Sequence, residues 1–84
     1  LHREKRYQAA IFYYEPLLQL NPNAVNYYNA ACAYSMTGNT DRAFEYLNIA
    51  IEKGYKVRSD YEADAELAPL KSDIRWGKLI LNLK

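Results

Sequence analysis

The sequence predicts an all-α protein made of antiparallel helical hairpins, and three of its features support this. Apolar residues recur at intervals of three and four positions, the spacing that places them on one face of a helix. Asn-Pro-Asn at residues 21–23 and single glycines at 38 and 54 interrupt this periodicity, as the ends of helices do. Alanine is concentrated in residues 30–33 and recurs at 43 and 50, which predicts helices in close contact.

The first predicted helix covers residues 7–20. Its apolar positions at helical spacing are Ile11, Tyr14, Leu17 and Leu18. Pro16 lies inside this helix and lacks the amide proton that would bond to the carbonyl of Phe12, so we expect a kink there. The Asn-Pro-Asn stretch then ends the helix, and Asn23 is a suitable N-cap for the next one.

Two further helices are predicted at residues 24–37 and from Asn39 or Thr40 to Lys53. Gly38 fits the left-handed position just past the end of the first of these helices. Asn39 or Thr40 can cap the second, and Gly54 closes it. Because the connection between them is short, the two helices are expected to be antiparallel neighbours.

Both of these helices are apolar around most of their circumference. A helix exposed to water on one side shows a single apolar stripe, so this pattern predicts neighbours on two sides. Small residues let helices approach closely, and those expected to face one another are Ala30 and Ala31 on one helix and Ala43 and Ala50 on the other. The larger side chains expected to fill the spaces between layers are Tyr27, Tyr34, Tyr46 and Leu47.

The tail, residues 58–84, contains signals for short helical segments. Ser59 and Glu62 have the spacing of a capping box, and Asp64 can cap a brief helix that ends at Leu70. Ser72 or Asp73 can cap a last helix. The residues of that helix that share one apolar face are Trp76, Leu79, Ile80 and Leu83.

Charge and composition exclude several classes of function. The formal net charge of +1 provides no long-range attraction toward nucleic acid or an anionic membrane, so we expect neither partner. No apolar run approaches the roughly 18 residues that a membrane-spanning helix needs. No signal-peptide core follows the first residues, which leaves the compartment, cytoplasmic or periplasmic, open. Leu1 is not a natural start, so we expect the chain to be part of a larger protein.

No catalytic, metal or cofactor site is expected. His2 is the single histidine and has no cysteine or carboxylate cluster at ligand spacing. Cys32 cannot form an internal disulfide and has no histidine within reach in the sequence, so a packing role is the simpler interpretation. The carboxylates of Glu62, Asp64 and Glu66 are interpreted as groups at helix N-termini.

Residues 24–57 resemble the tetratricopeptide repeat, whose pattern is W-x2-L-G-x2-Y followed by A-x3-F and a further alanine. The residues that carry the resemblance are Tyr27, Ala30, Ala31, Tyr34, Ala43, Leu47 and Ala50. Ala10 and Tyr14 occupy the A-x3-F positions of an upstream copy, so residues 1–23 are expected to be the second half of a truncated repeat. Residues 58–84 are similar to a segment that ends repeat arrays in many bacterial proteins. The resemblance implies a right-handed superhelical α-solenoid with a C-terminal capping helix.

The resemblance also implies a non-catalytic protein-interaction module that holds a peptide or a partner helix in a concave groove. The residues expected to line that groove are Val25, Tyr28, Asn29, Cys32, Ser35 and Met36. Asn29 matches the place where carboxylate-clamp members of the family carry an asparagine, which can hydrogen-bond a peptide backbone or carboxylate. The next segment, residues 59–67, is acidic, so a clamp for an acidic tail is incomplete.

Two alternatives are open at this stage. Each groove residue could instead pack against a neighbouring segment of the chain. The whole segment could also be structural or dimerising within a protein whose activity lies elsewhere. The apolar flank then expected to be uncovered and to allow a homo-oligomer consists of Tyr7, Ile11, Tyr14 and Leu18.

Overall fold

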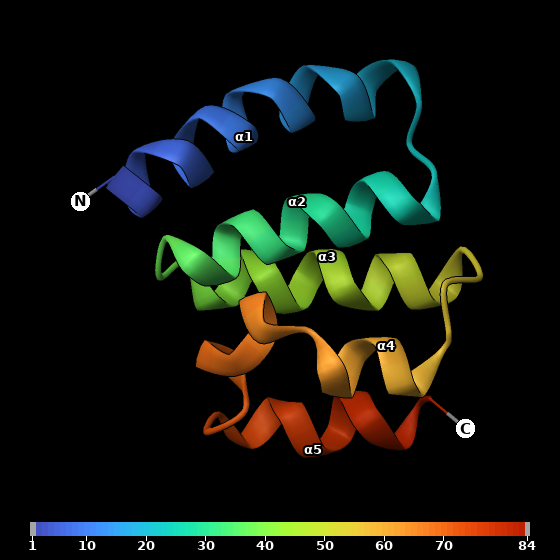
Figure 1. Ribbon diagram of the computed structural model, residues 1–84. Helices are drawn as coiled ribbons and strands as arrows, with labels where there is room; N and C mark the ends of the chain where they lie inside the picture. The colour runs from blue at the N-terminus through green and yellow to red at the C-terminus, as the bar shows by residue number, and fades with distance from the viewer. Residues whose placement is uncertain (1, 84) are drawn as a thin grey trace.

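The computed structural model describes residues 2–83, and the side chains of residues 5–83. These residues form helices and contain no β-strand, which confirms the predicted all-α class (Figure 1). The α-helices are α1 (His2–Leu20), α2 (Ala24–Met36), α3 (Thr40–Glu52), α4 (Arg58–Ala63) and α5 (Ile74–Leu81), and the short 3-10 helix η1 covers Ala65–Leu70. Helix α2 is central, because α1, α3 and η1 all pack against it.

Helices α2 and α3 form the predicted antiparallel hairpin, with bounds within one or two residues of those expected. Gly38 has φ 85°, in the left-handed region, and the amide of Asn39 donates to the carbonyl of Tyr34 at 2.9 Å across the turn. The side chains of Asn23 and Asn39 cap the two helices by accepting from the amides three residues on, at 2.8 and 3.3 Å.

The four alanines predicted to lie between the two helices are fully buried. Ala30, Ala31, Ala43 and Ala50 are each 0% exposed. Leu47 is equally buried, and the ring of Tyr46 meets the rings of Tyr27 and Tyr34 edge to face, with centroids 5.2 and 5.5 Å apart. Small side chains therefore set the distance between the helices while aromatic ones fill the space around them.

Helix α1 begins at His2, five residues before the predicted start, and continues through Pro16 to Leu20. The kink expected at Pro16 stays a prediction. Glu15 joins α1 to the hairpin, because the hydroxyls of Tyr34 and Tyr46 both donate to its Oε2 atom, the latter at 2.7 Å. Burial and this bond to Glu15 raise the pKa of Tyr34 to about 12, so its hydroxyl remains a donor at neutral pH.

The apolar flank expected to be uncovered on α1 was wrongly assigned. Leu18 is buried, and Ile11 and Tyr14 pack against the core, because this face of α1 lies against α2. The uncovered side chains of α1 are instead on its outer face, where Phe12 is 78% and Leu20 80% exposed. Both faces of α1 are apolar, so the residue pattern alone does not show which of them packs against the hairpin.

The tail folds over the opposite side of the hairpin. Asp64 and Asp73 cap η1 and α5 as predicted, and each accepts a hydrogen bond from a backbone amide at 2.9 Å. The capping box of Ser59 and Glu62 was wrong: α4 begins at Arg58 with Val57 as its N-cap, so Ser59 already lies inside the first turn. The carboxylate of Glu62 pairs with Arg58 at 3.0 Å instead.

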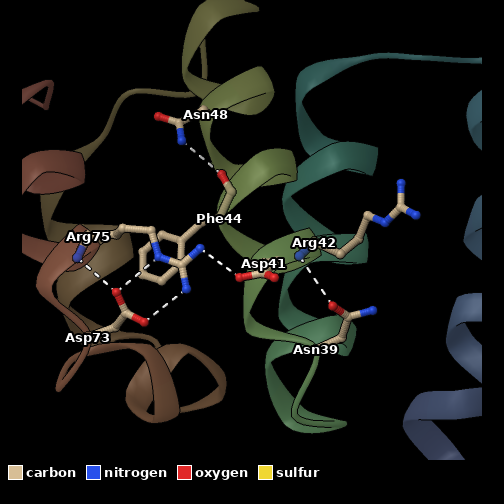
Figure 2. Close-up of polar contacts among 7 residues, drawn as sticks. All are labelled: Asn39, Asp41, Arg42, Phe44, Asn48, Asp73 and Arg75. Atoms are coloured by element: carbon tan, nitrogen blue, oxygen red, sulfur yellow. Dashed lines mark hydrogen bonds and ion pairs between the residues drawn. The ribbon is translucent and has the colours of Figure 1, made fainter.

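Helix α5 covers the end of the hairpin with the predicted face. Leu79, Ile80 and Leu83 are buried and Trp76 packs against the core. Figure 2 shows how α5 is fixed to α3: the guanidinium of Arg75 lies over the ring of Phe44, 4.7 Å from its centroid, and pairs with Asp73 and with Asp41 of α3 at 2.9 and 2.8 Å. The right-handed superhelix of several hairpins stays a prediction, since one complete hairpin is described.

Candidate functional site

The structure divides the six predicted groove residues into two sets. Tyr28, Cys32 and Ser35 are buried, with exposed fractions of 5%, 3% and 3%. Asn29 and Met36 are partly exposed, and Val25 is 56% exposed. Asn29, Met36 and Val25 are therefore the members of the set that a partner can reach.

Tyr28 and Cys32 of the buried set lie under the chain's own tail. The hydroxyl of Tyr28 donates to Oδ2 of Asp64 at 2.6 Å, and the thiol of Cys32 donates to the same atom at 3.6 Å. The ring of Tyr28 also meets the rings of Tyr55 and Tyr61, with centroids 4.6 and 5.1 Å away. Helix η1 packs against α2, so this part of its surface is filled from within the molecule.

Ser35 is an unusual member of this buried set. Its Oγ atom has no hydrogen-bond partner among the described residues, although the side chain is almost fully enclosed. A buried hydroxyl without a partner destabilises the folded state. It lines neither of the two hollows described below.

Asn29 faces a hollow between α1, α2 and η1, which we call the first hollow. Its volume is about 180 Å³, and its walls are Arg6, Tyr7, Ala10, Tyr14, Asn29, Ala33 and Glu66. The hydroxyl of Tyr7 donates to Oε2 of Glu66 at 2.6 Å, which joins α1 to η1 across the hollow. The amide of Asn29 and the carboxylate of Glu66 thus share one partly enclosed space with aromatic walls.

A second, more open hollow lies on the other side of Asp64. Its volume is about 330 Å³, and it is lined by Tyr28, Tyr55, Asp60, Ala63 and Asp64. The hydroxyl of Tyr55 donates to Oδ2 of Asp60 at 3.0 Å. Together Asp60, Asp64 and Glu66 form what we call the acidic strip, in which each carboxylate accepts one tyrosine hydroxyl.

The sequence interpretation missed these tyrosine–carboxylate pairs. It treated Asp64 and Glu66 as groups at helix ends and the tyrosines as packing residues. Asp64 does cap η1, but Glu66 contacts Tyr7, which lies 59 positions away in the chain. A pairing over that separation leaves no local signal; the short acidic spacing from Asp60 to Glu66 was the one visible hint.

A cluster of possible metal ligands lies at the strip, and the sequence interpretation did not anticipate it. Cys32 Sγ and one oxygen each from Asp64 and Glu66 lie within 4.8 Å of one another. Burial and then the charge of Asp64 raise the pKa of the Cys32 thiol well above its ordinary value, so the thiol remains protonated and donates a hydrogen bond to Asp64. A protonated thiol is neither a nucleophile nor a good metal ligand. The side chain of His2, the other residue considered, lies outside the described part of the chain.

The comparison with protein families decides the identity of the central hairpin. A family model described as a tetratricopeptide repeat matches residues 24–52. Residues 24–52 are a tetratricopeptide repeat. The match begins at the first residue of α2 and ends at the last residue of α3, so the tetratricopeptide repeat is the hairpin seen in the structure. Repeats of this family generally mediate protein–protein interactions.

One curated protein is similar in sequence to this chain over a longer stretch than the family match. The chain is 33% identical over 67 residues to a protein named Hsp70-Hsp90 organising protein from Plasmodium falciparum. The alignment covers 79% of this chain but 12% of that protein, so the chain spans a small part of the relative. The bacterial origin expected from the tail stays a prediction. No solved structure matches this chain.

The sequence also predicted that no segment of the chain spans a membrane. Within the described residues, no helix combines the length and the apolar character that crossing a bilayer requires. Helix α1 is the longest of the described helices, and it carries charged residues, among them Lys5, Arg6 and Glu15.

Proposed function

We propose that the chain is a non-catalytic interaction module that binds a peptide or partner helix at the first hollow, between α1, α2 and η1. Asn29 carries the proposal: it is the groove residue that lines a hollow and remains partly exposed. Its side-chain amide can donate to and accept from a peptide backbone, the usual way in which an extended segment is held. Val25 and Met36 would extend the contact along α2.

The proposal assigns parts of the chain to distinct roles. Residues 1–23 act as the second half of a truncated repeat, residues 24–57 as the complete repeat, and residues 58–84 as the cap. The packing of α1 and η1 on α2 supports this division, because the hollow needs one wall from each part.

The test replaces Asn29 by alanine in the intact protein. Partners are recovered by co-precipitation with the parent protein, and the recovered partner is then titrated against purified variants. We expect Asn29→Ala to weaken binding about tenfold, because a peptide hydrogen bond to a partly enclosed amide is lost, while the helical circular dichroism is unchanged. Tyr28 is unsuitable for this test because it is buried in the core.

The matched control is Asn48→Ala on α3. Asn48 is exposed, and its side-chain amide donates to the carbonyl of Phe44 within the same helix at 2.9 Å (Figure 2). This variant should bind as the parent does. Equal binding by Asn29→Ala and the parent would remove the assignment of the hollow.

A structural or dimerising role is the second candidate, and the outer face of α1 favours it. Phe12 and Leu20 are eight residues apart, which places them on one face of the helix, and both are largely exposed, as is typical of a surface that is covered in an assembly. This role requires concentration-dependent self-association in sedimentation velocity experiments. The interaction proposal requires instead a partner whose binding depends on Asn29.

A further inference from the structure

The acidic strip and its two hollows indicate the chemistry of the partner, an inference that rests on the proposed function. We propose that the strip docks a basic segment of a partner protein, with one lysine or arginine side chain entering each hollow on either side of Asp64. The partner is thus recognised by positive charge, and Asn29 holds its backbone beside the first hollow.

The first argument is the charge balance of the strip. Among the side chains of residues 5–83, the ion pairs join Arg42 to Glu45, Arg58 to Glu62, and Arg75 to Asp41 and Asp73. Asp60, Asp64 and Glu66 take part in none of them. Arg6 lines the first hollow with Glu66 but does not pair with it. Among the described side chains that line the two hollows, three are carboxylates and Arg6 is the cation.

The second argument is the geometry of those carboxylates. Oxygens of Asp64 and Glu66 lie within 4.8 Å of each other, a separation at which two negative charges in a partly enclosed place repel. The tyrosine hydroxyls offset part of this repulsion through hydrogen bonds but bring no charge. A cation from outside the chain would remove the remaining repulsion.

The third argument is the form of the two hollows. Each has aromatic walls and a small apolar floor, formed by Tyr7, Tyr14, Ala10 and Ala33 in the first hollow and by Tyr28, Tyr55 and Ala63 in the second. Tyrosine rings attract cations through their faces, and the methylene stem of lysine or arginine packs on apolar surface while its head reaches a carboxylate. Glu66 and Asp60 provide that carboxylate in the first and second hollows.

Three other occupants have different requirements. A divalent metal ion would have to displace the proton of the Cys32 thiol, which the pKa of that group opposes. A peptide ending in a carboxylate would place like charges together at the strip. A second copy of this chain could bring its own basic residues near the N-terminus, which include Lys5 and Arg6. Each of these is a distinguishable outcome of the test.

The test uses the intact protein and fluorescein-labelled Gly/Ser peptides that contain two lysines at varied separations, with two glutamates in the matched series. We expect fluorescence anisotropy to show binding of the lysine series only, with an affinity that falls as salt is added. Asp60→Asn and Glu66→Gln should each weaken it roughly threefold to tenfold, because the charge is lost while an oxygen still accepts the tyrosine hydroxyl.

The matched control is Glu45→Gln, which removes the same charge from the exposed surface of α3 and should bind lysine peptides as the parent does. Equal binding of the glutamate series, or no effect of Asp60→Asn and Glu66→Gln, would overturn the inference. Binding that EDTA abolishes would also overturn the inference, because it would indicate a metal ion. A protein that sediments as a dimer and dissociates as the peptide binds would overturn it too, because it would indicate a second copy of the chain.

The result also separates this inference from the function on which it rests. Binding of neutral or acidic peptides that is lost in Asn29→Ala would contradict the basic partner and leave the interaction module in place. If Asn29→Ala leaves the binding of lysine peptides unchanged, the acidic strip would be supported and the role given to Asn29 would be contradicted.

Discussion

At the scale of single residues, alanine and tyrosine have complementary tasks. Ala31 and Ala43 have no exposed surface. A larger side chain at either position would therefore force α2 and α3 apart. Tyrosine fills the space around them, and its hydroxyl also binds a carboxylate, as Tyr34 and Tyr46 do with Glu15. Phenylalanine would pack as well but would leave these carboxylates without their donors.

The alanine contact can be tested by enlarging one residue. Ala31→Leu should lower the free energy of unfolding by about 1–3 kcal/mol, because the added methylenes have no space between the helices. Urea denaturation followed by circular dichroism measures this. Ala9→Leu is the control: Ala9 is exposed on α1, so the same substitution should leave stability nearly unchanged. Equal stability of the parent and Ala31→Leu would mean that the helices are not in close contact there.

At the scale of elements, the attachment of α5 depends on a few polar groups at its start. Asp73 caps the helix and also binds the guanidinium of Arg75, which reaches across to Asp41 of α3 (Figure 2). The hydrogen bonds from Arg75 lower the pKa of Asp73 from its ordinary 3.8 to about 2. The cap is thus fixed to the repeat by charge as well as by its apolar face.

This lowered pKa predicts a defined acid sensitivity. The unfolded chain binds the proton more readily than the folded one, so the contribution of Asp73 is complete above pH 3.8 and is lost as the pH falls toward 2. Thermal melts across this range should show the parent more stable than Asp73→Asn near neutral pH, with the difference vanishing toward pH 2. Asparagine keeps the capping oxygen, so the comparison isolates the charge.

A control variant completes the comparison of caps. Asp73→Ala removes both the charge and the capping oxygen, so it should remain less stable than Asp73→Asn at every pH. A difference between the parent and Asp73→Asn that does not change with pH would contradict the assigned pairing with Arg75.

The elements that the sequence predicted correctly are those with local signals. Asn23, Asn39, Asp64 and Asp73 each cap the helix that follows within a few residues, and Gly38 takes the left-handed conformation its position requires. Such signals act between neighbours in the chain, so they can be read in order. The family pattern extended this prediction to the antiparallel pairing of α2 and α3, which the structure confirms.

The errors and omissions concern contacts between distant residues. Both faces of α1 are apolar, and only the packed structure shows that Leu18 faces inward while Phe12 faces out. The acidic strip depends on Tyr7 and Tyr28 meeting the tail across 59 and 36 positions. Of the predicted groove residues, Asn29 lines one of the two described hollows and remains partly exposed, whereas the tail covers Tyr28 and Cys32.

At the scale of the whole molecule, one tetratricopeptide hairpin is packed between an incoming helix and a folded tail. Helix α1 on one side and η1 on the other each supply a wall of the first hollow, so that site exists only when all parts are assembled. The tail serves both stability and recognition in this account: it buries the apolar face of the hairpin and contributes the acidic strip. The outer face of α1 takes no part in either.

The central claim is that a partner binds at the hollows beside the acidic strip. Chemical-shift mapping with ¹⁵N-labelled protein tests this claim most directly. Titration with a lysine-containing peptide should shift the amide signals of Asn29, Asp60 and Glu66 and leave those of Phe12 and Leu20 in place. Shifts confined to Phe12, Leu20 and the rest of the outer face of α1 would contradict the claim.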